Sequence, residues 1–479
     1  MKKVILSLGV CFFFLTSCDK WLTIRPENEI EKTKLYETEE GFWQALNGLY
    51  SIMGSNYGPT GHLQCSDVEF LASIWIASSE SVEQRLIDHQ YKDADADSRL
   101  ADVFLNQYNM IAHANTILEY LKQQDFLPER SYNIIKGEAL GMRAMLHFDL
   151  IRLWGPMPNN VDASYRYLPY VQQVSKKVNT YDTYGEYMEK LQADLDSAEF
   201  LLGKYEPLLT HTCNELNKNG GDDYDRLEYY WRQNHFNYYA VWGLKARIAL
   251  WMGDKERALT YAQMVKETLN VDGSVKFRLG TANDINITST DEAVNTLKAE
   301  CLFGYYLSYY NWQQEFNDNT ADFKTPISNI EGLFDDKNDF RYTLCWKVDP
   351  DVFTGEPQNV TTYKYKAYNN NWIPQIRLAE MYLIMIECAP LDVANVLYKE
   401  FCNSRGMGYK ELTEGSRMDI LQREYYKEFI GEGVIFLTYK RLHHDIWGNT
   451  SEDQVKADNN VFVFPIPEDE IEYGNRTQN

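Results

Sequence analysis

Four aromatic residues stand in irregular, polar stretches of the sequence: Trp75, Tyr309, Tyr310 and Trp312. Aromatic rings can stack on the flat C–H face of a sugar ring, while Asn, Asp, Gln or Arg at the rim binds its hydroxyls. The same rings can instead anchor a long loop to the core. Both interpretations stay open for each ring taken alone. We predict that segments 63–97 and 300–325, which carry the rings, line a ligand-binding site.

Motifs that would indicate catalysis are missing from the sequence. It contains no H-E-x-x-H, G-x-S-x-G, G-x-x-x-x-G-K or G-x-G-x-x-G, and Gly431-Glu432-Gly433 is too short for a phosphate loop. His443-His444-Asp445 could bind a metal, but adjacent residues point apart and no second cluster exists, which favours surface histidines. The 70 Asp and Glu residues leave a glycosidase pair open without indicating one. We therefore expect no enzyme, no cofactor and no metal-binding residue, and a bound structural metal stays open.

The first residues have the layout of a secretory signal peptide. Lys2 and Lys3 precede an apolar run, Val4 to Leu15, that is too short to span a bilayer. The run ends in Leu15-Thr16-Ser17-Cys18, which resembles a bacterial lipobox, in which the cysteine is acylated. We predict a signal peptide over residues 1–17 and a lipid anchor on Cys18. The alternative is a plain signal peptide in which Cys18 is incidental.

Composition excludes several partners. The formal net charge of -23 argues against nucleic acid and against direct adhesion to anionic lipid headgroups. No second apolar run is long enough to cross a membrane, so we expect a soluble body on a lipid tether. Of the 8 cysteines, Cys11 leaves with the signal and Cys18 is the anchor. The other six form no C-x-x-C, so a metal cluster is not expected, and their pairing cannot be deduced.

The elements that must position the site are helices with small residues at close-packing positions. Segment 136–158 carries apolar or small residues on one helical face and ends at Gly155 and Pro156. Segment 238–265 has the small residues and the Gly-Asp turn of a tetratricopeptide-type hairpin. Its first helix aligns with Leu140 to Leu150, and a third, looser hairpin begins at Ile376 and continues over Leu391 to Cys402. One hairpin cannot bury its own face, so we predict an all-α helical repeat scaffold with little β structure.

The remaining segments complete a single body over residues 18–479. Helical spacing also marks 39–50, 98–121, 181–202, 372–388 and 417–441, whereas the tail 461–471 is expected to be extended. Periodicity fades over 269–371, where Tyr, Trp, Asn and Asp accumulate. A stretch of this length is more often a functional insertion than a connection. The ligand is therefore expected there.

Several pieces of the sequence, in order along almost the whole chain, resemble the SusD/RagB family of surface nutrient-binding lipoproteins. None is specific alone, but together they are distinctive. The pieces are the lipobox Cys18, Gly41 to Tyr50 (GFWQALNGLY), Arg143 to Pro158 (RAMLHFDLIRLWGPMP), Leu244 to Asp254 (LKARIALWMGD), Arg377 to Cys388 (RLAEMYLIMIEC), Glu428 to Leu442 (EFIGEGVIFLTYKRL) and Phe464 to Ile471 (FPIPEDEI). The chain departs from the family after Cys388, where Ala389-Pro390-Leu391-Asp392 replaces the usual Gly-Asp turn, which puts the packing of the third hairpin in question.

The resemblance implies a tetratricopeptide-like scaffold whose loops bind an oligosaccharide or a peptide. It also implies delivery to a SusC-like TonB-dependent transporter, with the protein lipid-anchored in the outer membrane and exposed at the cell surface. Two alternatives stay open. One is a tetratricopeptide scaffold that binds only protein, and the other is a lipid-anchored hydrolase.

Overall fold

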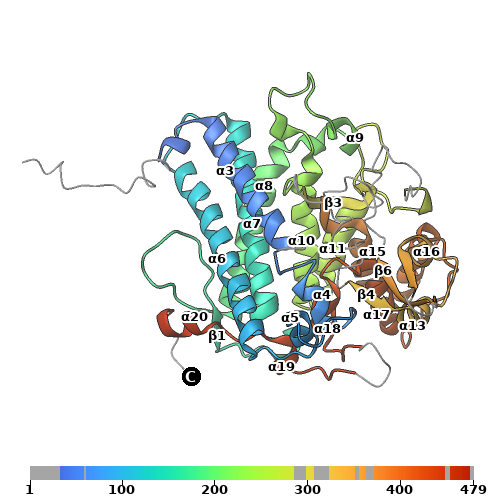
Figure 1. Ribbon diagram of the computed structural model, residues 1–479. Helices are drawn as coiled ribbons and strands as arrows, with labels where there is room; N and C mark the ends of the chain where they lie inside the picture. Colours follow the sequence, from blue (N-terminus) through green and yellow to red (C-terminus); the bar gives the residue numbers. More distant parts are fainter. Residues whose placement is uncertain are drawn as a thin grey trace, which may run out of the picture.

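The computed structural model describes residues 33–58, 61–284, 298–306, 323–350, 355, 357–362, 372–447 and 454–474. Its frame is a set of helices that pack side by side, most of them joined to a neighbour by a short turn (Figure 1). These helices are α3 (Glu39–Tyr57), α6 (Ala94–Leu121), α7 (Glu129–Trp154), α8 (Tyr184–Tyr205), α10 (Tyr238–Trp251), α11 (Lys255–Lys266), α15 (Leu378–Cys388) and α16 (Leu391–Arg405). The predicted all-α repeat scaffold is confirmed. None of the described helices combines the length and apolar character needed to cross a bilayer.

Small residues allow the close packing that the sequence predicts. A Cβ added at Gly141 of α7 would lie 2.3 Å from the ring of Phe236, and one at Gly243 of α10 would lie 2.5 Å from Ile376. The two glycines that align in the sequence are thus both places where a neighbour touches the helix backbone. One cluster of buried apolar side chains extends from Tyr36 to Phe464.

The third hairpin forms despite its unusual turn. Helix α15 ends at Cys388, Pro390 takes the N-cap position of α16, and α16 ends at Gly406, whose φ of 73° suits glycine. The prediction of one helix over 372–388 is wrong at its start, because Trp372–Arg377 forms strand β7. All six residues of β7 are buried, and a short buried apolar run fits a strand as well as a helix.

Short strands and helices surround the frame. Strand β1 (Arg166–Leu168) pairs with β2 (Asp182–Thr183), and β3 (Cys301–Tyr306) pairs with β7, both antiparallel. A three-stranded sheet has the order β4 (Lys324–Pro326), β6 (Pro357–Thr362), β5 (Trp346–Pro350), with α13 (Ile327–Leu333) and α14 (Phe340–Leu344) beside it. The described part of 269–371 is therefore more regular than expected. The short helical turns are η1 (Pro158–Asn160), η2 (Pro207–Leu209), α9 (Cys213–Leu216), η3 (Leu227–Tyr229), η4 (Arg232–Asn234), η5 (Ala282–Asp284) and η6 (Lys298–Glu300).

Three other expectations need correction. Segment 63–97 contains the short helices α4 (Asp67–Leu71) and α5 (Val82–Ile87), and the side chain of Ser81 caps α5 by accepting a hydrogen bond from the backbone N–H of Gln84. Segment 417–441 is two helices, α17 (Arg417–Phe429) and α18 (Ile435–Leu442), separated at glycines of positive φ. The tail is helical at α19 (Asn459–Phe462) and α20 (Glu468–Tyr473), and is extended only between them. There the backbone N–H of Phe464 donates to Leu153 O at 3.2 Å.

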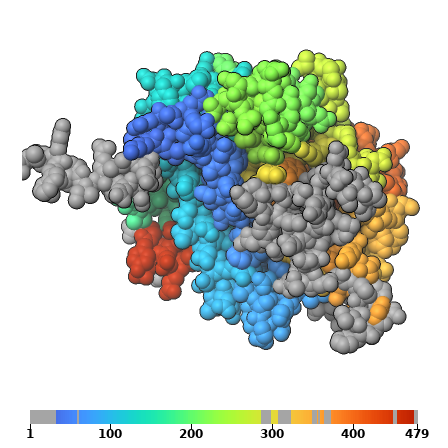
Figure 2. Space-filling view, turned by 45° about the horizontal axis from the view of Figure 1, so that its top comes forward, coloured from blue at the N-terminus to red at the C-terminus, as the bar shows by residue number. Residues whose placement is uncertain are grey.

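The N-terminal helix α3 lies on the surface against a segment far along the chain. Figure 2 shows this helix in dark blue beside the green segment around residue 226. Arg226 of that segment pairs with Glu40 of α3 at 2.7 Å, and its guanidinium lies 5.6 Å from the ring centre of Trp43. The predicted boundaries at residues 17 and 18 lie outside the described residues, so the signal peptide and the single body from residue 18 stay predictions.

Candidate ligand-binding site

The two segments predicted to line a site meet in the structure. The backbone N–H of Ile76 donates to Lys324 O at 2.7 Å, which forms an isolated antiparallel bridge at the start of β4. Strand β4 and helix α4 accordingly lie close together in Figure 1. Ile76 is 37% exposed and Val348 of β5 is 48% exposed, so this sheet presents apolar side chains at the surface. Segments 63–97 and 300–325 are therefore neighbours, as the sequence analysis expected.

Trp75, by contrast, does not lie where a ligand could reach it. Its side chain is fully buried and packs edge-on against Phe323, with ring centres 5.5 Å apart. Its Nε1–H donates to the carboxylate of Glu69 at 3.1 Å. A ring enclosed in this way cannot stack on a sugar, so the interpretation of Trp75 as a binding residue is corrected to that of a core anchor. Burial in the core was the alternative that the sequence left open.

The other three predicted rings, Tyr309, Tyr310 and Trp312, and the predicted anchor Cys18 lie outside the described residues. Their roles stay predictions. The structure describes the residues on either side of 307–322. Tyr306 ends β3 with 56% of its surface exposed, and Lys324 begins β4 beside Ile76. The segment that carries the three rings thus starts at an exposed tyrosine and returns next to the other predicted lining segment.

A buried carboxylate fixes the base of this region. Glu69 accepts hydrogen bonds from the backbone N–H groups of Gly431 at 2.9 Å and Gly433 at 2.5 Å, besides the one from Trp75. Both glycines have positive φ, 80° and 65°, which other residues adopt only with strain. The two N–H groups point at the same carboxylate, while the N–H of Glu432 between them donates to Phe429 O, so the turn binds an anion as a backbone nest does. Gly431-Glu432-Gly433, which is too short for a phosphate loop, therefore holds a carboxylate of the protein itself.

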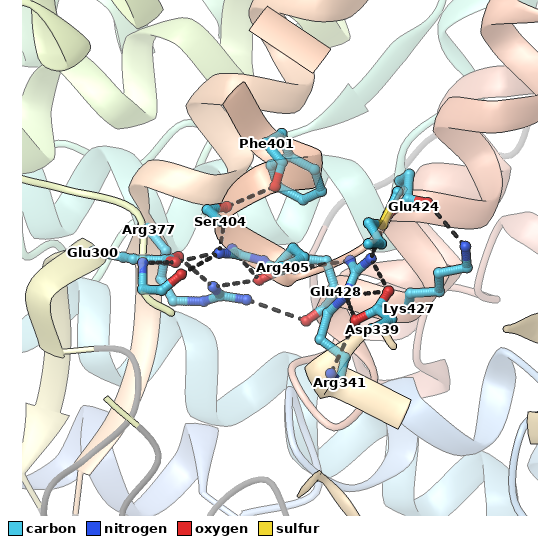
Figure 3. A network of polar contacts seen from close by, with 12 residues as sticks. Glu300, Asp339, Arg341, Arg377, Phe401, Ser404, Arg405, Glu424, Lys427 and Glu428 are labelled. Carbon is cyan, nitrogen blue, oxygen red and sulfur yellow. Dashed lines mark hydrogen bonds and ion pairs between the residues drawn. The ribbon is translucent and has the colours of Figure 1, made fainter. Parts of the chain in front are cut away.

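A network of buried charges connects this turn to the helical frame, and Figure 3 shows it at close range. Arg377 at the end of β7 binds both carboxylate oxygens of Glu432 at 2.8 Å and contacts Glu300 and Glu428 at 2.9 Å each. Arg405 of α16 contacts the same two glutamates, Glu428 at 3.0 Å and Glu300 at 2.9 Å. Both arginines are almost completely buried. The network therefore ties η6, β7, α16 and the turn after α17 together.

Arg341 of α14 continues the network on the other side of Glu428. It contacts Asp339 and Glu424 at 2.7 Å and Glu428 at 3.1 Å, while Lys427 contacts Glu424 at 2.9 Å. Burial alone would raise the pKa of Glu424, but the charges of Arg341 and Lys427 lower it below the usual value. A general acid needs the opposite shift, so Glu424 fits a structural link. The sequence did not indicate this network, because charged residues on helices normally face solvent.

A small cavity lies beside the Gly431–Gly433 turn. It has a volume of about 40 Å³, and its walls include Gln64, Asp149, Arg152 and Gly433. A space of this size holds one or two water molecules and is far below the roughly 300 Å³ of a small ligand pocket. A nutrient-sized ligand therefore does not fit in this space.

The residues weighed as metal ligands have other contacts. His444 Nδ1 lies 2.7 Å from Asp445 O, and His443 contacts the side chain of Asn159. Within the described ranges, no three His, Cys, Asp or Glu side chains converge as a metal-binding group. The six cysteines after Cys18 are all in described positions, and no disulfide joins any two of them: Cys65, Cys213, Cys301, Cys345, Cys388 and Cys402.

Comparison with known sequences gives consistent matches. A family model described as SusD-like, starch-binding and associating with the outer membrane matches residues 20–214. Two curated SusD-like proteins of Formosa agariphila are 29% identical over 153 residues and 27% identical over 158 residues. These matches cover 30% and 32% of this chain, and only 29% of the length of each relative.

Solved structures extend the likeness to nearly the whole chain. A SusD superfamily protein of Bacteroides thetaiotaomicron superposes with a TM-score of 0.69 at 18% identity, covering 91% of this chain and 98% of that one. One of Bacteroides vulgatus gives 0.69 at 20% identity, covering 91% and 97%. A laminarin-binding SusD-like protein gives 0.63 at 15% identity, covering 90% and 96%. These proteins share the tetratricopeptide-like fold described above.

Proposed function

We propose that this chain, which matches the SusD-like family model over residues 20–214 and resembles two curated SusD-like proteins, is a lipoprotein of the cell surface that binds a nutrient oligosaccharide. In this proposal Cys18 carries the lipid, the body stands on the outer face of the outer membrane, and the bound glycan passes to a SusC-like TonB-dependent transporter. The protein holds the glycan without cleaving it.

The pairing of Ile76 with Lys324 supports a site at the insertion most directly. It makes the two predicted lining segments neighbours, and Tyr306, the last described residue before position 307, is exposed. The family model describes starch-binding proteins, and one similar structure is a laminarin binder, which favours a carbohydrate as ligand. With Trp75 in the core, Tyr309, Tyr310 and Trp312 are the proposed stacking residues.

A panel of neutral oligosaccharides and peptides, titrated calorimetrically into the protein, tests the proposal. Trp312→Ala should weaken the best glycan about fivefold, because one stacked ring contributes about 1 kcal/mol. Tyr473→Ala, which removes a ring that is 68% exposed on α20, is the matched control and should leave the affinity unchanged. Equal affinity of Trp312→Ala and the parent for every glycan would contradict the stacking role.

The same panel separates the competing functions. Preferred binding of peptides would keep the transport role and change the ligand. Failure to bind any glycan or peptide would favour a scaffold that binds only protein. Appearance of shortened glycans after incubation, detected by mass spectrometry, would favour a hydrolase.

The anchor and the partner need separate experiments in the bacterial cell. Cys18→Ser should move the protein from the membrane fraction to the soluble fraction, because the acylated residue is lost. Affinity purification of the parent from detergent-solubilised outer membrane should recover a TonB-dependent transporter. Membrane retention of Cys18→Ser would refute the anchor, and purification without a transporter would refute the partnership.

A further inference from the structure

A second pocket, of about 490 Å³, lies between the end of α6, the first half of α7, the start of α8 and the connection from β1 to β2. In Figure 1, helices α6 and α7 lie on the side of the molecule away from the β4–β6–β5 sheet. The volume of the pocket falls within the roughly 300 to 1,000 Å³ of small-molecule sites. The residues around it are Leu118, Lys122, Lys136, Leu140, Arg143, Tyr170, Val171, Gln172, Gln173, Asn179, Thr180 and Lys190.

The charge of this pocket is opposite to that of the chain. The whole sequence carries a net charge of -23, yet the lining includes three lysines and an arginine and no Asp or Glu. Two carboxylates stand behind the wall, each with its own cation. Arg143 holds Asp194 through bonds of 2.6 and 2.7 Å, and Lys190 holds Asp182 at 2.7 Å.

Lys122 and Lys136 supply the surplus positive charge. Among the described residues neither has a carboxylate within salt-bridge distance. Lys136 Nζ donates instead to the hydroxyl of Tyr132 at 3.1 Å and lies 5.1 Å from the centre of that ring. A neutral hydroxyl leaves the ammonium free to bind an anion with its other protons. Lys122, at the C-cap of α6, is exposed at the mouth.

The rest of the lining suits a hydroxylated ligand. Gln172, Gln173, Asn179 and Thr180 are exposed and offer amide and hydroxyl groups, which can both donate and accept hydrogen bonds. The buried side chains of Leu118 and Leu140 add an apolar wall that can contact a C–H face. We propose that this pocket is a second binding site, which takes a compact acidic sugar, a mono- or disaccharide bearing a carboxylate or sulfate group. The acidic group lies between Lys122 and Lys136, and the rim amides bind the hydroxyls.

This proposal stands independently of the glycan site at the insertion, because the two regions share no residue. The test uses the full-length chain in detergent, titrated with methyl glucuronide, with methyl glucoside as its neutral counterpart and with inorganic sulfate. We expect methyl glucuronide to bind at least tenfold more tightly than either of the others. Its affinity should fall as the salt concentration rises from about 50 to about 300 mM, because salt screens the attraction between the lysines and the acidic group.

Lys136→Gln and Lys122→Gln should each weaken methyl glucuronide about tenfold, since each removes one charged hydrogen-bond donor. Lys136→Arg should retain most of the binding. Lys410→Gln, at an exposed lysine after α16, is the matched control and should change nothing. The melting temperature of each variant reports whether the fold is intact. If one of the two glutamine variants does not fold, the other still tests the proposal.

Four results would overturn the proposal. The first two are that the parent binds methyl glucoside, or inorganic sulfate, as tightly as it binds methyl glucuronide. The third is that the parent does not bind methyl glucuronide, and the fourth is that both glutamine variants bind it as tightly as the parent does. Loss of binding to neutral oligosaccharides in the Trp312→Ala variant, with methyl glucuronide binding retained, would show that the two sites are separate.

Discussion

Replacing Arg405 by methionine should destabilise the fold by about 3 kcal/mol. Arg405 is fully buried, and its guanidinium holds both carboxylate oxygens of Glu428 at 3.0 Å and Glu300 at 2.9 Å. Methionine fills a similar volume, so the cost arises from carboxylates that lose a cation in a dry environment. Arg377 still contacts both glutamates at 2.9 Å, which keeps the loss at the low end of the roughly 3 to 5 kcal/mol for breaking a buried pair.

Urea unfolding followed by circular dichroism measures this loss. For a chain of this length, about 3 kcal/mol corresponds to a melting temperature lower by roughly 3 °C. Arg257→Met is the matched control, because Arg257 lies half-exposed on α11 with its Nε 4.0 Å from Asp254. Such a surface pair contributes at most about 1 kcal/mol.

A double-mutant cycle with Glu300→Gln tests the cause. If the loss is electrostatic, removing the charge of Glu300 should recover part of it, with a coupling energy of about 1 to 3 kcal/mol. The reasoning is refuted if Arg405→Met is no more destabilising than Arg257→Met, or if the two losses in the cycle simply add.

Three further predictions concern other buried groups. Lys440→Met should lower the free energy of unfolding, measured with urea, by about 3 kcal/mol. The reason is that Lys440 Nζ donates to the carbonyls of Arg152 at 2.6 Å, Leu153 at 3.3 Å and Gly155 at 2.8 Å. Lys456→Met, at an exposed lysine, is the control and should lower it little. Burial lowers the pKa of His147 from 6.5 to about 3, so the unfolded chain binds a proton at this residue first as the pH falls below 6.5. His147 should therefore contribute about 2 kcal/mol to the loss of stability between pH 7 and pH 5, a share that His147→Gln should remove, while His89, whose pKa burial lowers to about 4, adds its own loss. Gly433→Ala should lower the melting temperature, because φ is 65° there and a Cβ would lie 2.4 Å from Gln64 O, whereas Gly332→Ala in α13, where nothing lies within 4 Å, should not.

The helical frame was predictable from the sequence because its signals are local. Small residues such as Gly141 and Gly243 mark points of contact between elements, and each has a neighbour that would clash with a Cβ. That segments 63–97 and 300–325 lie together was also anticipated, because both carry aromatic residues in irregular stretches and were predicted to line one site. Both inferences use residue types and spacing that can be read from a single sequence.

Other features depend on contacts between distant residues and were missed for that reason. Trp75 lies in a segment of weak periodicity, between Ile74 and Ile76, and only the structure shows that its ring packs against Phe323 and that its Nε1–H donates to Glu69. Strand β7 is a short apolar run, and its partner β3, about seventy residues earlier, decides that it is a strand. The charged residues of the buried network cannot be told from solvent-exposed ones in the sequence. Only the fold shows that distant partners such as Arg377 and Glu432 form a buried pair.

The contact of Glu69 with the turn at Gly431 and Gly433 bears on the order in which the chain folds. The two glycines follow Glu69 by 362 and 364 positions in the sequence. The hydroxyl of Tyr91 likewise donates to Val461 O at 2.6 Å, across 370 positions. Closures of this length are slow, since the ends of a long loop must first find each other. Glu69 and Tyr91 therefore gain these contacts only in a chain that already includes residues 431–461, so their surroundings complete their packing late in folding.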